Sequence, residues 1–334
     1  MVRAVRFGGS MRRRDFITLV CGAVAGWPLG APPQQRMPVV GLLRSTPALA
    51  FAHIVAAFRQ GLTEAGYIEG KNVIIEQRWA DNQLDKLPDL AADLVTRQAS
   101  VIVGNGPAVD AARGSAATTP FVFVIGGDPV ALGLVSSLNR PGGNFTGITF
   151  FSNRLGAKRL GLLRELVPGT NVIAALVDPS FPEAVEELRA VEEAGSTIGQ
   201  KIVPLKAGNE RDFDAAFTRM IQVGAGALVV VGSPFFTSKS QTLIALSARH
   251  TIPTIYDLRD YVVGGGLISY STSFTDAYRQ AGIYAGRILK GEKPSDLPVV
   301  LPTKFELAIN LKTAKDLGLA TPSGVMAIAE EVIE

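Results

Sequence analysis

Short runs rich in valine and isoleucine alternate with amphipathic stretches along the chain from Pro38 onward. This alternation constrains the fold more than any other feature, because it is typical of β-α-β units, in which helices cover both faces of a parallel sheet. The expected strands are Val39–Leu43, Val73–Glu76, Val101–Val103, Phe121–Ile125, Val172–Val177, Lys201–Leu205, Ala227–Val231, Thr254–Ile255, Leu267–Ser269 and Thr303–Ile309. The expected helices include Phe51–Ala65, Leu87–Gln98, Leu155–Leu166, Glu183–Ile198, Asp212–Val223 and Phe274–Leu289.

The pattern of the first four strands is repeated after Pro168, and 334 residues exceed the roughly 250 to 300 over which a single core grows. We therefore predict an α/β fold of two Rossmann-like lobes, each a parallel sheet flanked by helices. The turn-rich stretch Asn139–Asn144 suits a crossover, the helix 274–289 should return to the first lobe, and the strand 303–309 should cross again. The expected organisation is an export signal at 1–36, a first lobe of 37–150 plus 271–298, and a second lobe of 151–270 plus 299–334.

The net charge of +3 is concentrated at one end of the chain. Residues 1–31 hold five arginines against Asp15 alone, which leaves 28 of the 33 basic and 29 of the 30 acidic residues for the rest. The body of the protein is therefore nearly neutral and lacks the basic footprint of a nucleic-acid-binding domain. We expect no nucleic-acid partner.

The basic end has the pattern of an export signal. Three arginines at 12–14 precede an apolar run from Phe16 to about Trp27, which is too short for a bilayer that needs roughly 20 residues. The segment 13–17, Arg-Arg-Asp-Phe-Ile, resembles a twin-arginine signal. A disordered basic tail is the alternative, but it would have no use for the apolar run. We predict an exported, periplasmic protein whose signal peptide is removed and whose mature chain does not insert into the membrane.

Cys21 is the only cysteine and lies inside this segment. The mature chain should therefore contain no disulfide and no thiolate metal site. A lipid-anchored cysteine would need a small residue before it, whereas Val20 stands there.

Five expected strands end in a small polar residue or glycine close to a proline. The five sequences are Ser45-Thr46-Pro47, Asn105-Gly106-Pro107, Gly127-Asp128-Pro129, Asp178-Pro179-Ser180 and Gly232-Ser233-Pro234. A polar N-cap followed by proline opens a helix, and in a parallel sheet such openings gather at the carboxyl edge, where ligands bind. Each turn alone is also what any α/β fold needs to cap its helices, but five of them predict a polar cleft. Its free N–H groups would attract an anionic group such as a carboxylate.

Aromatic side chains stand beside several of these strand ends. They are Phe150 and Phe151, Phe235 and Phe236, Tyr256 next to Asp257, and Tyr270 next to Ser271. Such rings could hold a planar or apolar part of a ligand while Asp128 or Asp257 pairs with an ammonium group. The alternative is that the rings fill the core.

Patterns of catalytic chemistry are mostly missing. The sequence has no phosphate-binding loop, no nucleophile elbow and no H-E-x-x-H, and its two histidines, His53 and His250, fall in expected helices. Most carboxylates should lie on solvated helix faces, as in Glu183, Glu186, Glu187, Glu192 and Glu193. We predict no catalytic residue, no metal and no cofactor. An exported α/β enzyme that uses the same cleft remains the alternative, whereas a transcription regulator would need a helix-turn-helix before the first strand.

Several longer motifs match a known family. They are the leader 11–17, Phe58-Arg59-Gln60-Gly61-Leu62, Gly126-Gly127-Asp128-Pro129-Val130, the stretch 138–144 and Tyr278-Arg279-Gln280-Ala281-Gly282-Ile283-Tyr284. Through them, residues 38 to about 319 resemble the ABC-transporter substrate-binding proteins of the branch that includes tryptophan and tyrosine binders.

The resemblance implies a type I periplasmic binding fold with three crossings between the lobes, capture of a small ligand by hinge closure, and delivery to the membrane permease of an ABC importer. It places Ser45, Thr46, Asn105, Asp128, Ser233, Tyr256 and Tyr270 at or near the cleft. Two positions depart from the family pattern: Ser233 stands where an acidic residue is common, and Asp257-Leu258-Arg259 replaces a common Pro-Trp-Arg. The ligand implied is a small polar molecule, an amino acid or an aromatic acid.

Overall fold

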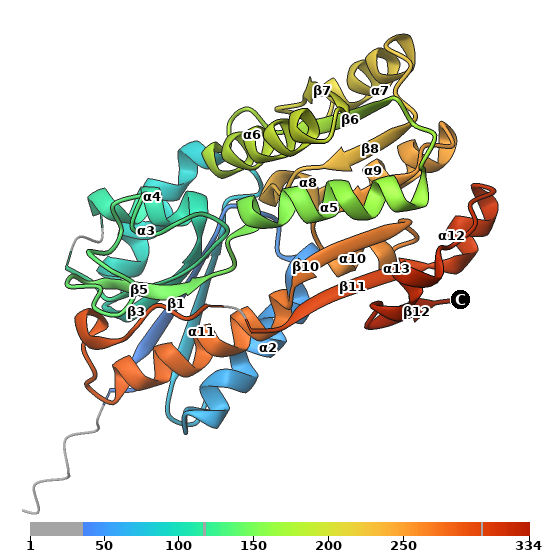
Figure 1. Cartoon of the computed structure of the whole chain (residues 1–334). Coiled ribbons are helices and arrows are strands. Elements are labelled where there is room, and N and C mark those ends of the chain that lie inside the picture. The colour runs from blue at the N-terminus through green and yellow to red at the C-terminus, as the bar shows by residue number, and fades with distance from the viewer. Residues whose placement is uncertain (1–35, 116–117, 302) are drawn as a thin grey trace, which may run out of the picture. The chain divides into compact units, whose positions relative to one another are not determined.

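The computed structural model describes residues 36–115, 118–301 and 303–334, which contain two β-sheets (Figure 1). Apart from residue 36, the expected export signal with its twin-arginine motif and Cys21 lies outside the described residues. The first sheet has the strand order β2-β1-β3-β4-β5 and the second β12-β11-β10-β9-β8-β6-β7. All pairs are parallel except β10 with β11. The two-lobed α/β prediction is confirmed.

The strands lie close to the predicted ranges. In the first sheet they are β1 (Val39–Arg44), β2 (Ile74–Trp79), β3 (Ala99–Asn105), β4 (Phe121–Ile125) and β5 (Phe145–Thr149). In the second they are β6 (Val172–Val177), β7 (Lys201–Lys206), β8 (Ala227–Val230), β9 (Thr254–Tyr256), β10 (Ile268–Thr272), β11 (Phe305–Asn310) and β12 (Glu331–Ile333). The sequence reading missed β5 and β12, because the first is only five residues long with a glycine at its centre and the second is a three-residue edge strand.

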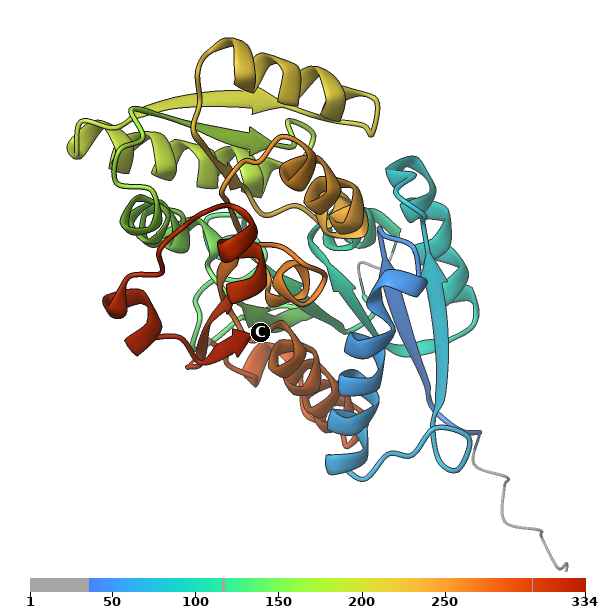
Figure 2. The same ribbon diagram turned by 90° about the vertical axis from the view of Figure 1, so that its right-hand side faces the viewer.

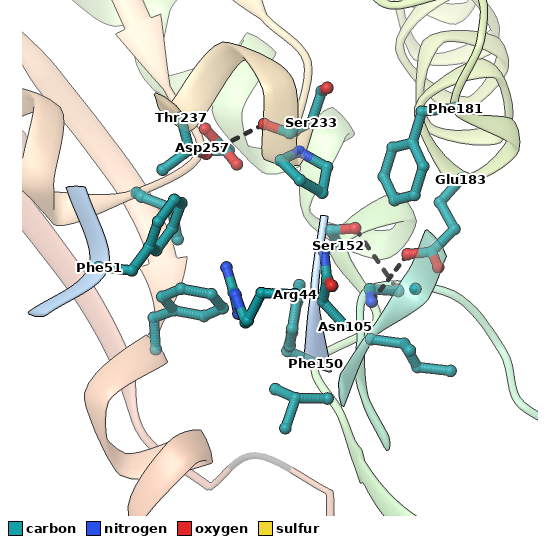
Figure 3. A pocket seen from close by; sticks show the side chains of 18 residues that line it. Arg44, Phe51, Asn105, Phe150, Ser152, Phe181, Glu183, Ser233, Thr237 and Asp257 are labelled. Carbon is teal, nitrogen blue, oxygen red and sulfur yellow. Dashed lines mark hydrogen bonds between the residues drawn. The ribbon is translucent and has the colours of Figure 1, made fainter. Parts of the chain in front are cut away.

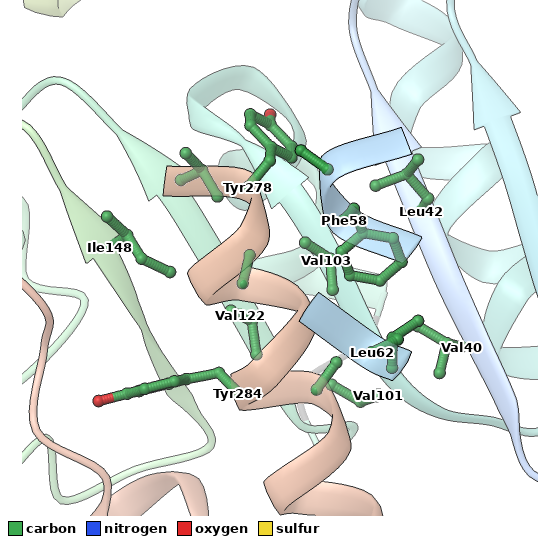
Figure 4. Packing of buried hydrophobic residues seen from close by; sticks show 14 of the residues in the cluster. Val40, Leu42, Phe58, Leu62, Val101, Val103, Val122, Ile148, Tyr278 and Tyr284 are labelled. Carbon is green, nitrogen blue, oxygen red and sulfur yellow. The ribbon is translucent and has the colours of Figure 1, made fainter. Parts of the chain in front are cut away.

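Helices cover both faces of the first sheet because alternate strand side chains point to opposite sides. Val40, Leu42 and Val103 face one pair of helices, whereas Leu43 and Ile102 face the other. The first pair is α2 (Ala52–Glu64), preceded by η1 (Leu49–Phe51), and α11 (Phe274–Leu289); the second is α3 (Leu87–Thr96), preceded by η2 (Leu84–Lys86), and α4 (Gly106–Ser115). Figure 4 shows the core between the sheet and the α2–α11 pair.

Helices α2 and α11 cross at two glycines. A Cβ atom on Gly61 would lie 1.8 Å from the carbonyl oxygen of Arg279, and one on Gly282 would lie 2.2 Å from that of Phe58. Only glycine allows the two backbones to approach so closely. Two of the motifs that carry the family resemblance, 58–62 and 278–284, therefore build the first lobe.

The second sheet is covered in the same way. Its residues Ala174, Leu176 and Val230 pack against α7 to α10, and Ile173 and Val229 pack against α5, α6, α12 and α13. The helices are α5 (Ser152–Leu166), α6 (Pro182–Thr197), α7 (Asp212–Gln222), α8 (Pro234–Ser238), α9 (Ser240–Arg249), α10 (Arg259–Val263), α12 (Leu311–Asp316) and α13 (Ser323–Ala327). Figure 2 shows the C-terminal helices beside the helices and strands of this lobe.

The chain passes between the sheets three times. It leaves the first sheet after β5, returns from β10 into α11, and leaves again after η3 (Pro294–Asp296) to form β11. Helix α11 packs on α2 and on β3, β4 and β5 of the first sheet. Within the described ranges, no helix has both the length and the apolar character needed to cross a membrane.

Candidate functional site

A pocket lies where strands of both sheets end, and we call it the central pocket (Figure 3). The first sheet contributes Arg44 from the end of β1, Asn105 from the end of β3 and Gly126 after β4. The second contributes Gly232 and Ser233 after β8, together with Asp257 and Leu258 after β9, and the remaining lining residues are Phe51, Gly106, Val124, Ile125, Phe150, Ser152, Phe181, Glu183, Pro234, Thr237 and Phe274. The non-atom space at this pocket is about 520 Å³, a figure that includes open solvent.

Arg44 is the most unusual residue in the pocket. Its side chain is buried, and its guanidinium lies over the rings of Phe51 and Tyr278, at 4.4 and 5.1 Å from the ring centroids. Within the described chain, the Nε and Nη1 atoms have no hydrogen-bond partner, and Nη2 donates only a long 3.5 Å bond to Thr46 Oγ1. Burial without a carboxylate partner lowers the pKa of Arg44 from 12.5 to about 9, so it still carries its charge at neutral pH.

Among the residues that the structure describes, Asp257 is the other side chain with a charged atom that lacks a hydrogen bond. Its Oδ1 is enclosed and makes no hydrogen bond to a described residue, while its Oδ2 lies close to Gly232, where an added Cβ would be 2.9 Å away. Desolvation is the largest cause that raises the pKa of Asp257 to about 7, against the opposing effect of Arg159. Arg44 and Asp257 thus both line the pocket, and both carry enclosed atoms without a hydrogen-bond partner in the described chain.

Glu183 enters the pocket from the first turn of α6 and binds across to the first lobe. Its Oε2 accepts a hydrogen bond of 2.8 Å from the backbone N–H of Gly126. A Cβ on Gly106 or Gly126 would come within 3 Å of the Glu183 carboxylate, so a larger residue at either position would displace that side chain. Burial raises the pKa of Glu183 to about 7 despite this hydrogen bond.

A buried ion pair stands behind the second-lobe wall. Arg159 of α5 pairs with Glu187 of α6, and its Nε donates to the carbonyl oxygen of Tyr270 at 2.9 Å. Glu187 also accepts from the N–H of Gly232 at 3.2 Å. The pair therefore fixes the loop after β8 that lines the pocket.

Aromatic rings form much of the remaining wall. They belong to Phe51, Phe150, Phe181 and Phe274, and the rings of Phe150 and Phe274 meet edge to face with centroids 5.9 Å apart. An apolar wall with a few polar groups is the usual composition of a site for a small organic molecule.

Four of the fourteen predicted site residues line the central pocket, namely Asn105, Gly106, Ser233 and Asp257. Asn105 binds the first strand end through Ser45, donating to its Oγ at 2.8 Å and accepting from its N–H at 3.2 Å. Ser233 donates to Asp178 Oδ2 at 2.8 Å and caps α8 by accepting from the N–H of Phe235.

Three more line a neighbouring cavity, which shares Phe181 and Pro234 with the central pocket. They are Ser45, Ser180 and Phe235. We call this space the outer cavity.

The other seven lie elsewhere. Tyr256 is buried in the core of the second lobe, stacked on Tyr261 at 4.5 Å, and Tyr270 stacks on Phe305. The rest are Thr46, beside Arg44; Gly127, whose carbonyl accepts from Thr149; Asp128, whose Oδ1 accepts from the N–H of Val130; Phe151, in a left-handed conformation before α5; and the buried Ser271.

The rule of a polar residue and proline opening a helix holds for two of the five strand ends. Ser233 caps α8, and Gly106 and Pro107 begin α4. At Asp128 and Asp178 the carboxylate instead accepts from the N–H two residues later, which forms a turn. After β1, the 3-10 helix begins at Leu49, beyond Pro47.

The prediction that the acidic residues of α6 are solvated was wrong for two of the five. Glu183 and Glu187 are buried, whereas Glu186, Glu192 and Glu193 are exposed. Residues 183 and 187 share the buried face with apolar residues spaced three to four positions apart, and that spacing was the available signal. Arg44, Phe51, Phe181 and Phe274 were not predicted either, whereas Phe150 was among the aromatic residues expected beside the strand ends. No group of three His, Cys, Asp or Glu side chains arranged for a metal occurs in the described part of the chain.

Comparisons with known proteins agree with this geometry. The family model described as ABC transporter substrate binding protein matches residues 43–333. A curated relative, the tyrosine-binding protein of Clostridioides difficile strain R20291, is 23% identical over 263 residues, 78% of this chain and 75% of the relative.

Two solved structures share the fold. A conserved domain protein from Vibrio cholerae has a TM-score of 0.83 and 24% identity, covering 89% of this chain and 100% of that one. An ABC domain in complex with L-Trp from Streptococcus pneumoniae has a TM-score of 0.81 and 24% identity, covering 89% and 99%.

Proposed function

The chain belongs to the family of ABC transporter substrate-binding proteins, and we propose on this premise that it captures a small carboxylate-bearing ligand in the central pocket and delivers it to the permease of an ABC importer. The ligand class is an amino acid or an aromatic acid. The two lobes close over it about the three chain crossings and open to release it.

The observation that carries the proposal is the unpaired guanidinium of Arg44. A buried charge without a partner is costly, and a ligand carboxylate would offer two oxygens to the Nε and Nη atoms. The aromatic wall supplies apolar contact for the rest of the ligand. The names of two similar proteins, a tyrosine-binding protein and a complex with L-Trp, support an aromatic amino acid among the candidates.

The contacts between the lobes support closure as the binding motion. Besides the hydrogen bond from Gly126 to Glu183, Asn82 donates to Ser238 Oγ at 3.0 Å, and His53 lies 3.0 Å from a carboxylate oxygen of Asp260. The two groups of the His53–Asp260 contact are 41% and 36% exposed, and such contacts contribute at most about 1 kcal/mol. Contacts of this strength hold a closed form that can still open.

We propose the periplasm as the site of action. The basic and apolar pattern of residues 1–36 supports export with removal of the signal. The test is fractionation of cells that express the full chain, compared with a variant in which Arg13 and Arg14 are both replaced by lysine. Retention of the variant inside the cell and release of the wild type with the periplasmic fraction are expected.

Ligand binding is tested by native mass spectrometry of the purified protein, followed by thermal-shift titration with amino acids and aromatic acids. A ligand of the closed form raises the melting temperature in proportion to the logarithm of its concentration above Kd. Absence of a shift with every carboxylate tested would refute the proposal, and chemical conversion of a bound compound would point to an enzyme instead.

A further inference from the structure

Among the charged side chains that line or adjoin the central pocket, two have enclosed atoms without a hydrogen-bond partner in the described chain. Arg159 and Glu187 pair with each other, and Glu183 accepts from the N–H of Gly126. The two are Arg44 and Asp257. Within the described chain, Nε and Nη1 of Arg44 and Oδ1 of Asp257 have no hydrogen-bond partner. Both residues line the same pocket.

The two side chains approach the pocket from different lobes. Arg44 is the last residue of β1 in the first sheet, whereas Asp257 follows β9 of the second. Figure 3 shows both side chains at the border of the same open space, with Phe51 beside them. A ligand that touched both would join the lobes by two charged contacts.

We infer that Arg44 binds the carboxylate of the ligand and Asp257 binds its ammonium group, so that the pocket selects a zwitterion over an acid or an amine of the same shape. This inference rests on the proposed function and deepens it, because the proposed function alone does not distinguish amino acids from aromatic acids as ligands. The unpaired atoms of Arg44 then gain the ligand carboxylate as a partner, and Oδ1 of Asp257 gains the ligand ammonium group.

Neighbouring carboxylates are less suited to the ammonium group. Asp128, which the sequence also offered, does not line the pocket, and its Oδ1 already accepts from the backbone N–H groups of Val130 and Ala131. Glu187 is committed to Arg159 and Gly232. Glu183 is committed to Gly126.

Two matched series of three compounds test the inference on the wild-type protein. The first is L-tryptophan, indole-3-propionate and tryptamine, and the second is L-leucine, 4-methylpentanoate and 3-methylbutylamine. Within each series the apolar body stays nearly the same while the ammonium or the carboxylate is removed. Isothermal titration calorimetry should show the amino acid of at least one series binding about 10- to 100-fold more tightly than its acid and its amine, the range for a charged hydrogen bond.

Substitutions then assign each charge to its residue. Asp257→Asn should weaken the amino acid about 10- to 100-fold and leave the acid nearly unchanged, and Arg44→Gln should weaken both the amino acid and the acid but not the amine. Asp128→Asn and Arg154→Gln are the matched controls, since neither residue lines the pocket, and they should leave all affinities within about twofold of the wild type.

The outcomes separate the inference from the function on which it rests. An acid that binds as tightly as its amino acid would refute the inference and leave the proposed function standing. A protein that binds neither these six compounds nor any of the amino acids and aromatic acids of the thermal-shift titration would overturn both. Should a pocket variant fail to fold, as judged by its melting curve, the comparison of ligands on the wild type still decides.

Discussion

Replacement of Arg44 by methionine should make the ligand-free protein more stable. The pKa of this buried guanidinium falls from 12.5 to about 9 through desolvation, which corresponds to a cost of about 5 kcal/mol at roughly 1.4 kcal/mol per pH unit. Methionine removes the charge and keeps most of the stem. It also loses the contacts of the cation with the rings of Phe51 and Tyr278, worth about 1 to 2 kcal/mol each.

The net expectation is a gain of about 1 to 3 kcal/mol, or roughly 2 to 6 °C in melting temperature for a chain of this size. The assay is thermal and urea unfolding without ligand. The sign of the pH dependence follows from the lowered pKa: the cost is full below pH 9 and shrinks as pH rises toward 12.5, so the advantage of the variant should be about 1 kcal/mol smaller at pH 10 than at pH 7.

Arg154→Met is the matched control. Arg154 is exposed and lies over the ring of Phe151, so its loss should lower stability by no more than about 1 kcal/mol. A fall in the melting temperature of Arg44→Met would refute the reasoning, because it would mean that the native protein stabilises this charge.

Three further predictions concern other buried groups. Burial raises the pKa of Glu183 from 4.5 to about 7, so the contribution of this residue to stability is full below pH 4.5 and is lost as pH rises through 7. Glu183→Gln should therefore reduce the fall in melting temperature between pH 4.5 and 8 by the equivalent of about 3 kcal/mol. Equal pH profiles of the variant and the wild type would contradict this. Gly61→Ala should cost about 3 kcal/mol or more in urea unfolding, since its Cβ would meet a carbonyl oxygen of α11 at 1.8 Å, whereas Gly161→Ala, with open space in α5, should be neutral or stabilising. Arg159→Met should lower the free energy of unfolding by about 3 to 5 kcal/mol, because it leaves the buried Glu187 without its partner. Adding Glu187→Leu should restore part of this stability. A double variant less stable than the single one would argue against an isolated ion pair.

The strand ends illustrate what the sequence could predict. Asn105, Ser233 and Asp257 were expected at the cleft because parallel strands bring their carboxyl ends to one edge of a sheet, a rule that needs no tertiary detail. Tyr256, the neighbour of Asp257, was also expected at the cleft but lies in the core. Its ring is stacked on Tyr261 in the core, and a sequence does not tell which of two neighbouring side chains faces the cleft.

Arg44 shows the opposite limit. An arginine at the end of a strand is usually solvated, and nothing local marks this one as buried. Its enclosure depends on Phe51, which follows in the same segment, and on Tyr278, which arrives from a helix more than two hundred residues later. Long-range packing of this kind decides burial, and burial decides which charges are left for a ligand.

The glycine contact between α2 and α11 bears on how the protein is made. Helix α11 is synthesised after β6 to β10 of the second sheet, so until then the apolar surface formed by one face of the first sheet and by Phe58 and Leu62 of α2 lacks its partner helix. The core of the first lobe is therefore complete only after α11 has been made. Any factor that shields nascent chains would have to guard this surface until residue 289 has emerged.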